Sequence, residues 1–179
     1  MARFDTLLLE RAAGIRLLAL DVDGVLTDGK IYFDSAGNEL KAFHTRDGLG
    51  MKALQRYGVR LAIITGRKSP MVTQRATELD IDFVFQDSSD KLGAYMELLE
   101  KSGLEAREVC YAGDDWIDLP VLQRCGLAIT VPAADHEVRD RVHWVTTREG
   151  GDGAVREICD LILTAQGHSE ALLQDLLAR

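Results

Sequence analysis

The sequence predicts an α/β fold, a doubly wound parallel sheet with helices on both of its faces. Three observations support this prediction. Short apolar runs alternate with amphipathic segments, polar residues follow several of these runs directly, and no repeat or low-complexity stretch interrupts them. Because 179 residues are enough to bury one core but few for two, we expect a single domain over residues 1–179.

Six apolar runs predict the strands. In chain order, the expected strands cover residues 16–21, 59–64, 82–85, 108–112 and 127–131, with a weaker sixth at 142–145. Apolar residues at three- and four-residue intervals fill most of the gaps between them, and this spacing is typical of amphipathic helices. The expected helices cover residues 47–57, 69–79, 90–102 and 116–124.

One segment, residues 28–46, interrupts the alternation. Two runs with strand character, 31–33 and 40–43, flank a loop that contains Gly37, and this pattern predicts a β-hairpin. Because the hairpin follows the first strand directly, we expect it to hang over the end of the sheet as a flap. No other insertion is long enough to form a separate cap domain.

Composition excludes several classes of partner. A net charge of −8 and a pI near 5.0 argue against a nucleic-acid surface, which needs a basic face. No apolar run approaches the roughly 20 residues that span a bilayer, and the N-terminus does not resemble a secretory signal. Cys110, Cys125 and Cys159 lack CxxC spacing, which disfavours a disulfide framework or a zinc site. We therefore expect a cytoplasmic protein without a membrane partner.

Two carboxylates, Asp21 and Asp23, end the first expected strand, and Gly24 then allows a turn. Side chains alternate along a strand, so these two are expected to point in the same general direction. Their like charges repel unless a cation or a proton relieves them. Mg²⁺ is the expected cofactor, because it favours carboxylate oxygen and keeps waters that a phosphate can replace. A calcium-binding loop is disfavoured, because it would place its glycine later and would follow a helix.

Two further positions suit a phosphate group. Thr65 and Arg67 follow the strand at 59–64, where a hydroxyl and a guanidinium can bind phosphoryl oxygens. Lys91 opens the helix at 90–102, although a cation is unfavourable beside the positive end of a helix dipole. The alternative interpretation is an ordinary helix start at 65–67 and a solvent-facing lysine.

A second acidic group, Asp114, Asp115 and Asp118, follows the strand at 108–112. Asp114 is placed to complete the cation site, and the other two are placed to orient waters or to hold Lys91. Helix capping by Asp115, with Asp118 in the first turn, explains one or two of these acids as well. Capping does not explain why Asp114 accompanies the acidic pair of the first strand.

In chain order, Asp21-x-Asp23-Gly24, Thr65, Lys91 and Gly113-Asp114-Asp115 resemble the four motifs of the haloacid dehalogenase superfamily of phosphohydrolases. The resemblance covers residues 16 to about 165 and implies the Rossmann-like fold of that superfamily. The hairpin, the missing cap and the segments 44–48, 64–68 and 150–157 are similar to the phosphatases of 3-deoxy-D-manno-octulosonate 8-phosphate. Those enzymes are tetramers that supply an eight-carbon sugar acid for lipopolysaccharide synthesis.

The resemblance implies a role for each motif. Asp21 would be the nucleophile that forms an aspartyl-phosphate, and Asp23 would be the general acid and then the general base. Mg²⁺ would be held by Asp21, the main-chain carbonyl of Asp23, and Asp114. Thr65 and Lys91 would balance the charge of the transferring phosphoryl group.

The resemblance also implies a set of substrate contacts. They are Asp23, His44, Thr45, Arg46, Asp47, Gly48, Lys52, Arg67, Arg75 and Lys91. Lys52 departs from the family pattern, where arginine is usual, and a lysine loses bidentate geometry. Arg156 is expected to face a neighbouring subunit's site. The tail, residues 167–179, carries a leucine stripe suited to packing on another subunit.

Other functions stay open on the sequence alone. Phosphatases of nine-carbon sugar acids share the cap-less layout. A phospho-acceptor receiver domain also has an acidic pocket with a threonine and a lysine, but its phosphorylated aspartate ends a middle strand. A receiver is distinguished by an acyl phosphate that lasts much longer than seconds. A non-catalytic binding module would not be expected to keep the complete acidic set.

Overall fold

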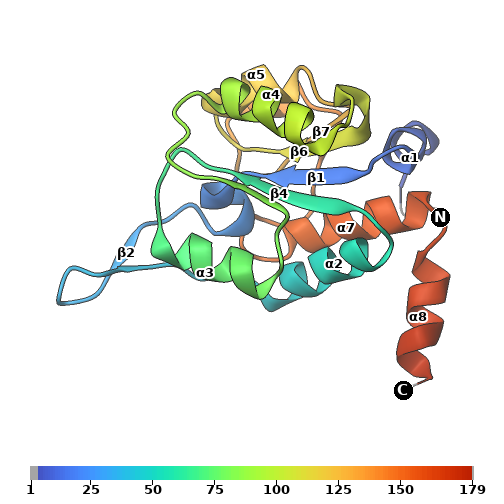
Figure 1. Ribbon diagram of the computed structural model, residues 1–179, viewed down its shortest axis with the longest axis horizontal. Helices are drawn as coiled ribbons and strands as arrows, with labels where there is room; N and C mark the ends of the chain where they lie inside the picture. The colour runs from blue at the N-terminus through green and yellow to red at the C-terminus, as the bar shows by residue number, and fades with distance from the viewer. Residues whose placement is uncertain (1–3, 179) are drawn as a thin grey trace.

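A computed structural model describes residues 4–178 and contains a central sheet of six parallel strands in the order β5-β4-β1-β6-β7-β8 (Figure 1). Each of these six strands lies inside its expected range. Their bounds are β1 (Leu17–Leu20), β4 (Arg60–Ile64), β5 (Phe83–Phe85), β6 (Val109–Ala112), β7 (Leu127–Thr130) and β8 (Trp144–Val145). The predicted doubly wound parallel sheet is confirmed.

The sheet reverses its winding beside β1. Ala19 of β1 is in register with Ala62 of β4 on one side and with Tyr111 of β6 on the other. The chain first builds outward through β4 to β5, then returns to β6 and builds outward again to β8. Ligands of such sheets bind beyond the carboxyl ends of the strands at the point of reversal. This position lies at the ends of β1, β4 and β6.

Helices cover both faces of the sheet (Figure 1). One layer contains α1 (Thr6–Ala13), α2 (Thr45–Arg56), α3 (Pro70–Glu78) and α7 (Ala154–Ala165), and the other contains α4 (Lys91–Ser102), α5 (Leu119–Leu122) and α6 (His136–Arg139). Leu18 and Leu20 of β1 pack in the first layer, whereas Leu17 and Ala19 pack in the second. Alternating side chains thus fill two cores, which explains why β1 is apolar throughout.

Three local expectations need correction. β1 ends at Leu20, so Asp21 and Asp23 do not share a strand; Asp23 lies in the tight loop η1 (Val22–Leu26), which turns at Gly24 with φ +97°. The helix expected at 116–124 is divided into the 3₁₀ turn η3 (Trp116–Asp118) and α5, because proline opens α5. The short elements α1, α6 and η2 (Ala106–Glu108) were not expected.

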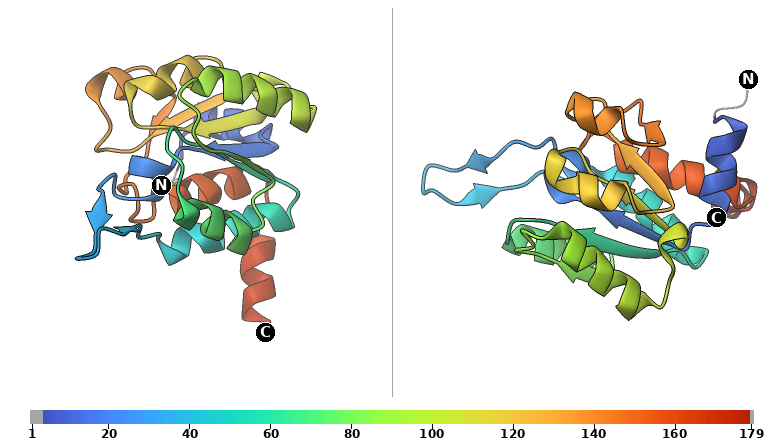
Figure 2. Two further views of the ribbon diagram at one scale, coloured as in Figure 1. Left: turned by 60° about the vertical axis from the view of Figure 1, so that its left-hand side comes forward. Right: turned by 90° about the horizontal axis from the view of Figure 1, so that it is seen from above.

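The segment 28–46 contains the predicted hairpin. Its strands β2 (Tyr32–Phe33) and β3 (Glu39–Leu40) pair antiparallel, and the hairpin projects from the body of the molecule (Figure 2). Phe33 and Leu40 are more than half exposed. Within residues 4–178 this hairpin is the one sheet besides the central sheet, and no cap domain is present.

The predicted tail, residues 167–179, contains the helix α8 (Ser169–Leu177), which points away from α7 (Figure 2). Leu173, Leu176 and Leu177 on it are 48–71% exposed. Residue 179 of this tail and residues 1–3 of the predicted domain lie outside the described residues. None of the helices in residues 4–178 has the length and hydropathy of a membrane span.

Candidate active site

A cavity of about 270 Å³ lies at the carboxyl ends of β1, β4 and β6. It brings together side chains from all four sequence motifs, which are far apart in the chain. Its lining contains Asp21, Asp23, Gly29, Thr65, Gly66, Arg67, Lys91, Asp114, Asp115 and Ile117. The nucleophile, acid, metal and phosphate positions expected from the sequence therefore share one site.

Lys91 lies at the centre of this site, with a side chain that is 1% exposed. Its ammonium group is 2.9 Å from the carboxylate of Asp21 and 2.7 Å from that of Asp118. Two carboxylates compensate for the unfavourable position of a cation in the first turn of α4. The expectation that Asp118 holds Lys91 is confirmed.

Asp118 is fully buried and accepts hydrogen bonds on both oxygens. Oδ1 accepts from Lys91 and, at 2.5 Å, from the hydroxyl of Tyr111. Oδ2 accepts from the main-chain N–H groups of Asp114 and Asp115, at 3.1 and 3.2 Å. The same contacts complete a capping box with Asp115, so the capping interpretation is also correct. Asp118 thereby fixes Lys91 and the loop that carries Asp114.

The acidic side chains are strongly perturbed. Burial, reinforced by the negative charge of Asp118, raises the pKa of Asp21 to about 7 and that of Asp114 to about 6, although Lys91 opposes both shifts. Burial alone would lower the pKa of Lys91, but the charges of Asp21 and Asp118 raise it above its usual value. The site thus holds more negative charge than its lysine can neutralise.

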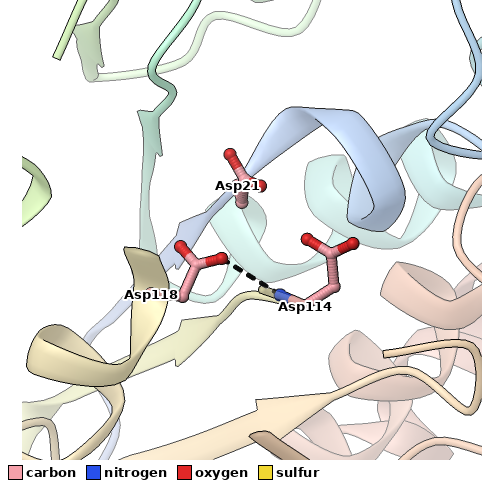
Figure 3. Close-up of side chains that lie close together, drawn as sticks. All are labelled: Asp21, Asp114 and Asp118. Carbon is pink, nitrogen blue, oxygen red and sulfur yellow. Dashed lines mark hydrogen bonds between the residues drawn. The ribbon is translucent and has the colours of Figure 1, made fainter. Parts of the chain in front are cut away.

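Oxygen atoms of Asp21, Asp114 and Asp118 lie within 4.8 Å of one another, and Figure 3 shows the three carboxylates side by side. Asp118 is committed to its four donors, which leaves Asp21 and Asp114 to bind a cation. A Cβ on Gly24 would lie 2.0 Å from Asp114 Oδ2, so only glycine allows Asp114 to approach the main chain next to Asp23. Hard oxygen ligands with excess negative charge fit Mg²⁺.

Thr65 and Arg67 also line the cavity. Thr65 is buried, and its hydroxyl oxygen accepts weakly from the N–H of Arg67 at 3.5 Å. The guanidinium of Arg67 is 3.1 Å from the carboxylate of Glu39 in β3 of the hairpin. A hydroxyl and a guanidinium therefore both reach the cavity, as a phosphate site requires.

Two residues of the hairpin, Glu39 and Lys41, were missed by the sequence analysis. Lys41 is bonded to the carboxylate of Asp23 and lies 3.2 Å from that of Glu39. Alternation along the descending arm was the available signal, since Glu39 and Lys41 share one face of an extended chain.

Residues 44–48 do not line the cavity; they lie in the start of α2 and in the residue before it. His44 caps α2, its Nδ1 accepting from the N–H of Arg46 at 3.2 Å, while Thr45 and Arg46 are exposed. Asp47 is buried, which raises its pKa, and it accepts from the N–H of Arg156 at 2.8 Å. Asp47 therefore joins α2 to the start of α7.

The two remaining residues predicted to contact substrate, Lys52 and Arg75, also lie outside the cavity lining. Lys52 is paired with the exposed Asp80 at 2.5 Å. Arg75 lies over the ring of Phe43 and 3.3 Å from Glu78, and a Cβ at Gly48 would lie 2.6 Å from its guanidinium. A substrate role for these side chains stays a prediction.

The glycine-rich segment before α7, residues 150–153, packs against the loop η1. The N–H of Gly151 donates to the carbonyl of Val25 at 3.1 Å. A Cβ at Gly150 would lie 1.7 Å from the carbonyl oxygen of Gly24. The segment is thus packed against η1, the loop that carries Asp23.

Comparison with known proteins places this geometry in a family. A model of the haloacid dehalogenase-like hydrolases matches residues 81–158. Over 162 residues the chain is 48% identical to 3-deoxy-D-manno-octulosonate 8-phosphate phosphatase KdsC of Yersinia pestis, covering 90% of this chain and 87% of that protein. The chain belongs to this phosphatase family.

Solved structures of relatives agree with the family assignment. A phosphatase of the same name from Moraxella catarrhalis, in complex with magnesium ion, phosphate ion and KDO, has a TM-score of 0.94 and 44% identity, covering 97% of this chain and 99% of that one. A cobalt-bound relative from Haemophilus influenzae has a TM-score of 0.85 and 39% identity, covering 88% and 92%. One relative contains bound magnesium and the other bound cobalt, in agreement with the acidic cluster.

Proposed function

We propose that this phosphoric monoester hydrolase removes phosphate from 3-deoxy-D-manno-octulosonate 8-phosphate, in the synthesis of a lipopolysaccharide precursor. The observation that carries the proposal is the buried carboxylate of Asp21, paired with Lys91 in a cavity that also contains Thr65 and Asp114. The chain is acidic overall, so Arg67 and Lys91 supply the local positive charge that a phosphate needs.

Asp21 is the proposed nucleophile. Its carboxylate attacks phosphorus, so that a bond forms between Asp21 and phosphorus while the bond from phosphorus to the sugar oxygen breaks. Asp23 gives its proton to that oxygen, and in the second step it removes a proton from the water that attacks the aspartyl-phosphate. Thr65 and Lys91 bind the phosphoryl oxygens throughout.

Asp21 and Asp114, with the main-chain carbonyl of Asp23, would hold Mg²⁺. When bound, Mg²⁺ supplies positive charge that offsets the charge of the phosphoryl group. Without it, burial, reinforced by the negative charge of Asp118, raises the pKa of Asp21 and favours its protonated form, which is a poor nucleophile. The charge of Lys91 lowers the pKa of Asp21, and a bound Mg²⁺ would act in the same direction.

Phosphate release from a panel of sugar phosphates, with Mg²⁺ and with EDTA, tests the proposal. We expect a clear preference for the eight-carbon sugar acid and no release in EDTA. Asp21→Asn is expected to abolish turnover while the melting temperature stays close to that of the wild type. Preference for a nine-carbon sugar acid would change the assigned substrate and leave the phosphatase activity in place. An acyl phosphate stable for much longer than seconds would support a phospho-acceptor receiver domain instead.

A homotetramer in the cytoplasm is the proposed assembly and location. The exposed apolar residues of the hairpin and of α8 support self-association, because large apolar surfaces are usually covered. Three arginines expected to contact substrate lie outside the cavity lining: Arg46, Arg75 and Arg156. We propose that these arginines contact substrate where two subunits meet. Light scattering of the purified chain tests the assembly; a monomer with full activity would contradict it.

Three buried, free cysteines fit a reducing compartment. Cell fractionation with a periplasmic marker tests the location.

A further inference from the structure

The descending arm of the hairpin places one buried lysine, Lys41, against a residue of the site, Asp23. The hairpin strands are largely exposed, yet the side chain of Lys41 is 2% exposed. A lysine loses hydration when it is buried, so it needs compensating partners. Lys41 has two of them, the carboxylates of Asp23 and Glu39.

The contact with Asp23 is specific in its atoms. Lys41 Nζ donates to Oδ1 of Asp23. Within residues 4–178 no other side chain forms a hydrogen bond or ion pair with this carboxylate. Asp23 lies in η1 at φ −77° and ψ 112°, outside regular helix or strand, so its main chain alone does not fix the side chain. Lys41 therefore restricts the orientation of the carboxyl group and leaves Oδ2 open.

Glu39 connects this pair to Arg67, a second residue of the cavity lining. Its carboxylate is 3.2 Å from Lys41 and 3.1 Å from Arg67, and its side chain is 19% exposed. Four charged groups, Asp23, Lys41, Glu39 and Arg67, thus form a continuous chain of ion pairs that begins and ends at residues of the cavity lining. Because Glu39 and Lys41 belong to the hairpin, the position of the hairpin sets the position of Asp23.

We propose that Lys41 is a positioning residue that orients Asp23 for proton transfer. Lys41 holds Oδ1, and Oδ2 carries the proton that passes to the leaving sugar oxygen as the bond between phosphorus and that oxygen breaks. In the second step Oδ2 accepts a proton from the attacking water, while Oδ1 stays bonded to Lys41. The inference rests on the proposed phosphatase function and adds a hairpin residue to its mechanism.

Leaving-group dependence tests the proposal. A sugar alkoxide needs a proton in order to leave, whereas p-nitrophenolate leaves without one, so a misplaced general acid slows only the first substrate strongly. We expect Lys41→Met to lower kcat for the sugar phosphate about 30-fold, and kcat for p-nitrophenyl phosphate less than 3-fold, with little change in KM. Lys41→Arg, which keeps a cationic donor, should recover part of the lost rate.

Lys30→Met is the matched control, because Lys30 lies in the same segment, has a side chain that is 73% exposed and forms an ion pair with Asp28. It should retain wild-type rates on both substrates. Glu39→Gln, which removes one anchor of Lys41, should show a weaker form of the same selective loss, and it tests the network if Lys41→Met fails to fold.

Equal losses on the two substrates, or no loss, would overturn the positioning role while the phosphatase assignment stands. A wild-type enzyme inactive on both substrates would overturn the proposed function and the positioning role together.

Discussion

Replacement of Asp118 by asparagine tests whether this buried carboxylate holds the site together. Asp118 is fully buried and receives four donors, from Lys91, Tyr111 and two main-chain N–H groups. An asparagine has the same shape but only one accepting oxygen. The NH₂ group of this asparagine must face either Lys91 and Tyr111 or the main-chain N–H groups of Asp114 and Asp115. In both orientations a hydrogen-bond donor of asparagine would face two other donors.

The expected loss of stability follows from these contacts. Breaking a buried ion pair by removing one partner costs about 3 to 5 kcal/mol. Asp118 also repels Asp21 and Asp114, and the loss of this repulsion returns part of the energy. We therefore expect a loss near the lower limit, about 3 kcal/mol, which for a chain of this length lowers Tm by about 6 to 12 °C.

Thermal and urea denaturation of Asp118→Asn measure this loss, and steady-state kinetics should show kcat lowered about 100-fold because Lys91 loses an anchor. Asp115→Asn is the matched control, since Asp115 caps an exposed turn through the N–H of Trp116 and asparagine caps as well as aspartate. A Tm for Asp118→Asn within about 1 °C of the control, with full activity, would refute the reasoning.

Two further predictions concern the acidic cluster. Because the pKa of Asp21 is raised to about 7 and that of Asp114 to about 6, protons stabilise the metal-free fold at low pH, and this stabilisation is lost as the pH rises through these values. Mg²⁺ replaces the protons, so it should raise Tm more at about pH 8 than at about pH 5.5, measured against EDTA; equal shifts would contradict the linkage. Gly24→Ala should weaken Mg²⁺ binding about 10-fold in calorimetry, because its Cβ displaces Asp114. Gly37→Ala has a similar positive φ but no atom within 4 Å, so it should leave Mg²⁺ affinity unchanged, and equal affinities in the two variants would argue against the contact.

The strands and the acidic cluster were predictable from the sequence for the same physical reason. A strand buried on both faces is apolar at every position, so a polar residue that ends the run marks the end of the strand. Asp21, Thr65 and Asp114 each follow such a run, and parallel strands bring these ends together. The end of β1 was placed too late because Val22 continues the apolar pattern inside a loop.

Contacts between distant segments were not predictable in this way. Lys41 lies 18 residues from Asp23, and their contact depends on how the hairpin folds back. Asp47 and Arg156 are 109 residues apart, and only the packing of α2 on α7 brings them together. In contrast, α1 had an available signal that was not used, since Asp5 precedes an apolar spacing typical of a helix and caps Leu8.

The packing of Gly150 and Gly151 against η1 has a consequence for the order of events during synthesis. Asp21 and Asp23 are made early, but the main chain that packs against their loop, at Gly150 and Gly151, is made more than a hundred residues later. A ribosome-bound chain that ends before residue 150 contains every proposed catalytic side chain and still lacks the support behind η1. We expect such a nascent chain to be inactive, so that catalytic competence arises only after residues 150 and 151 have been made and have packed against η1.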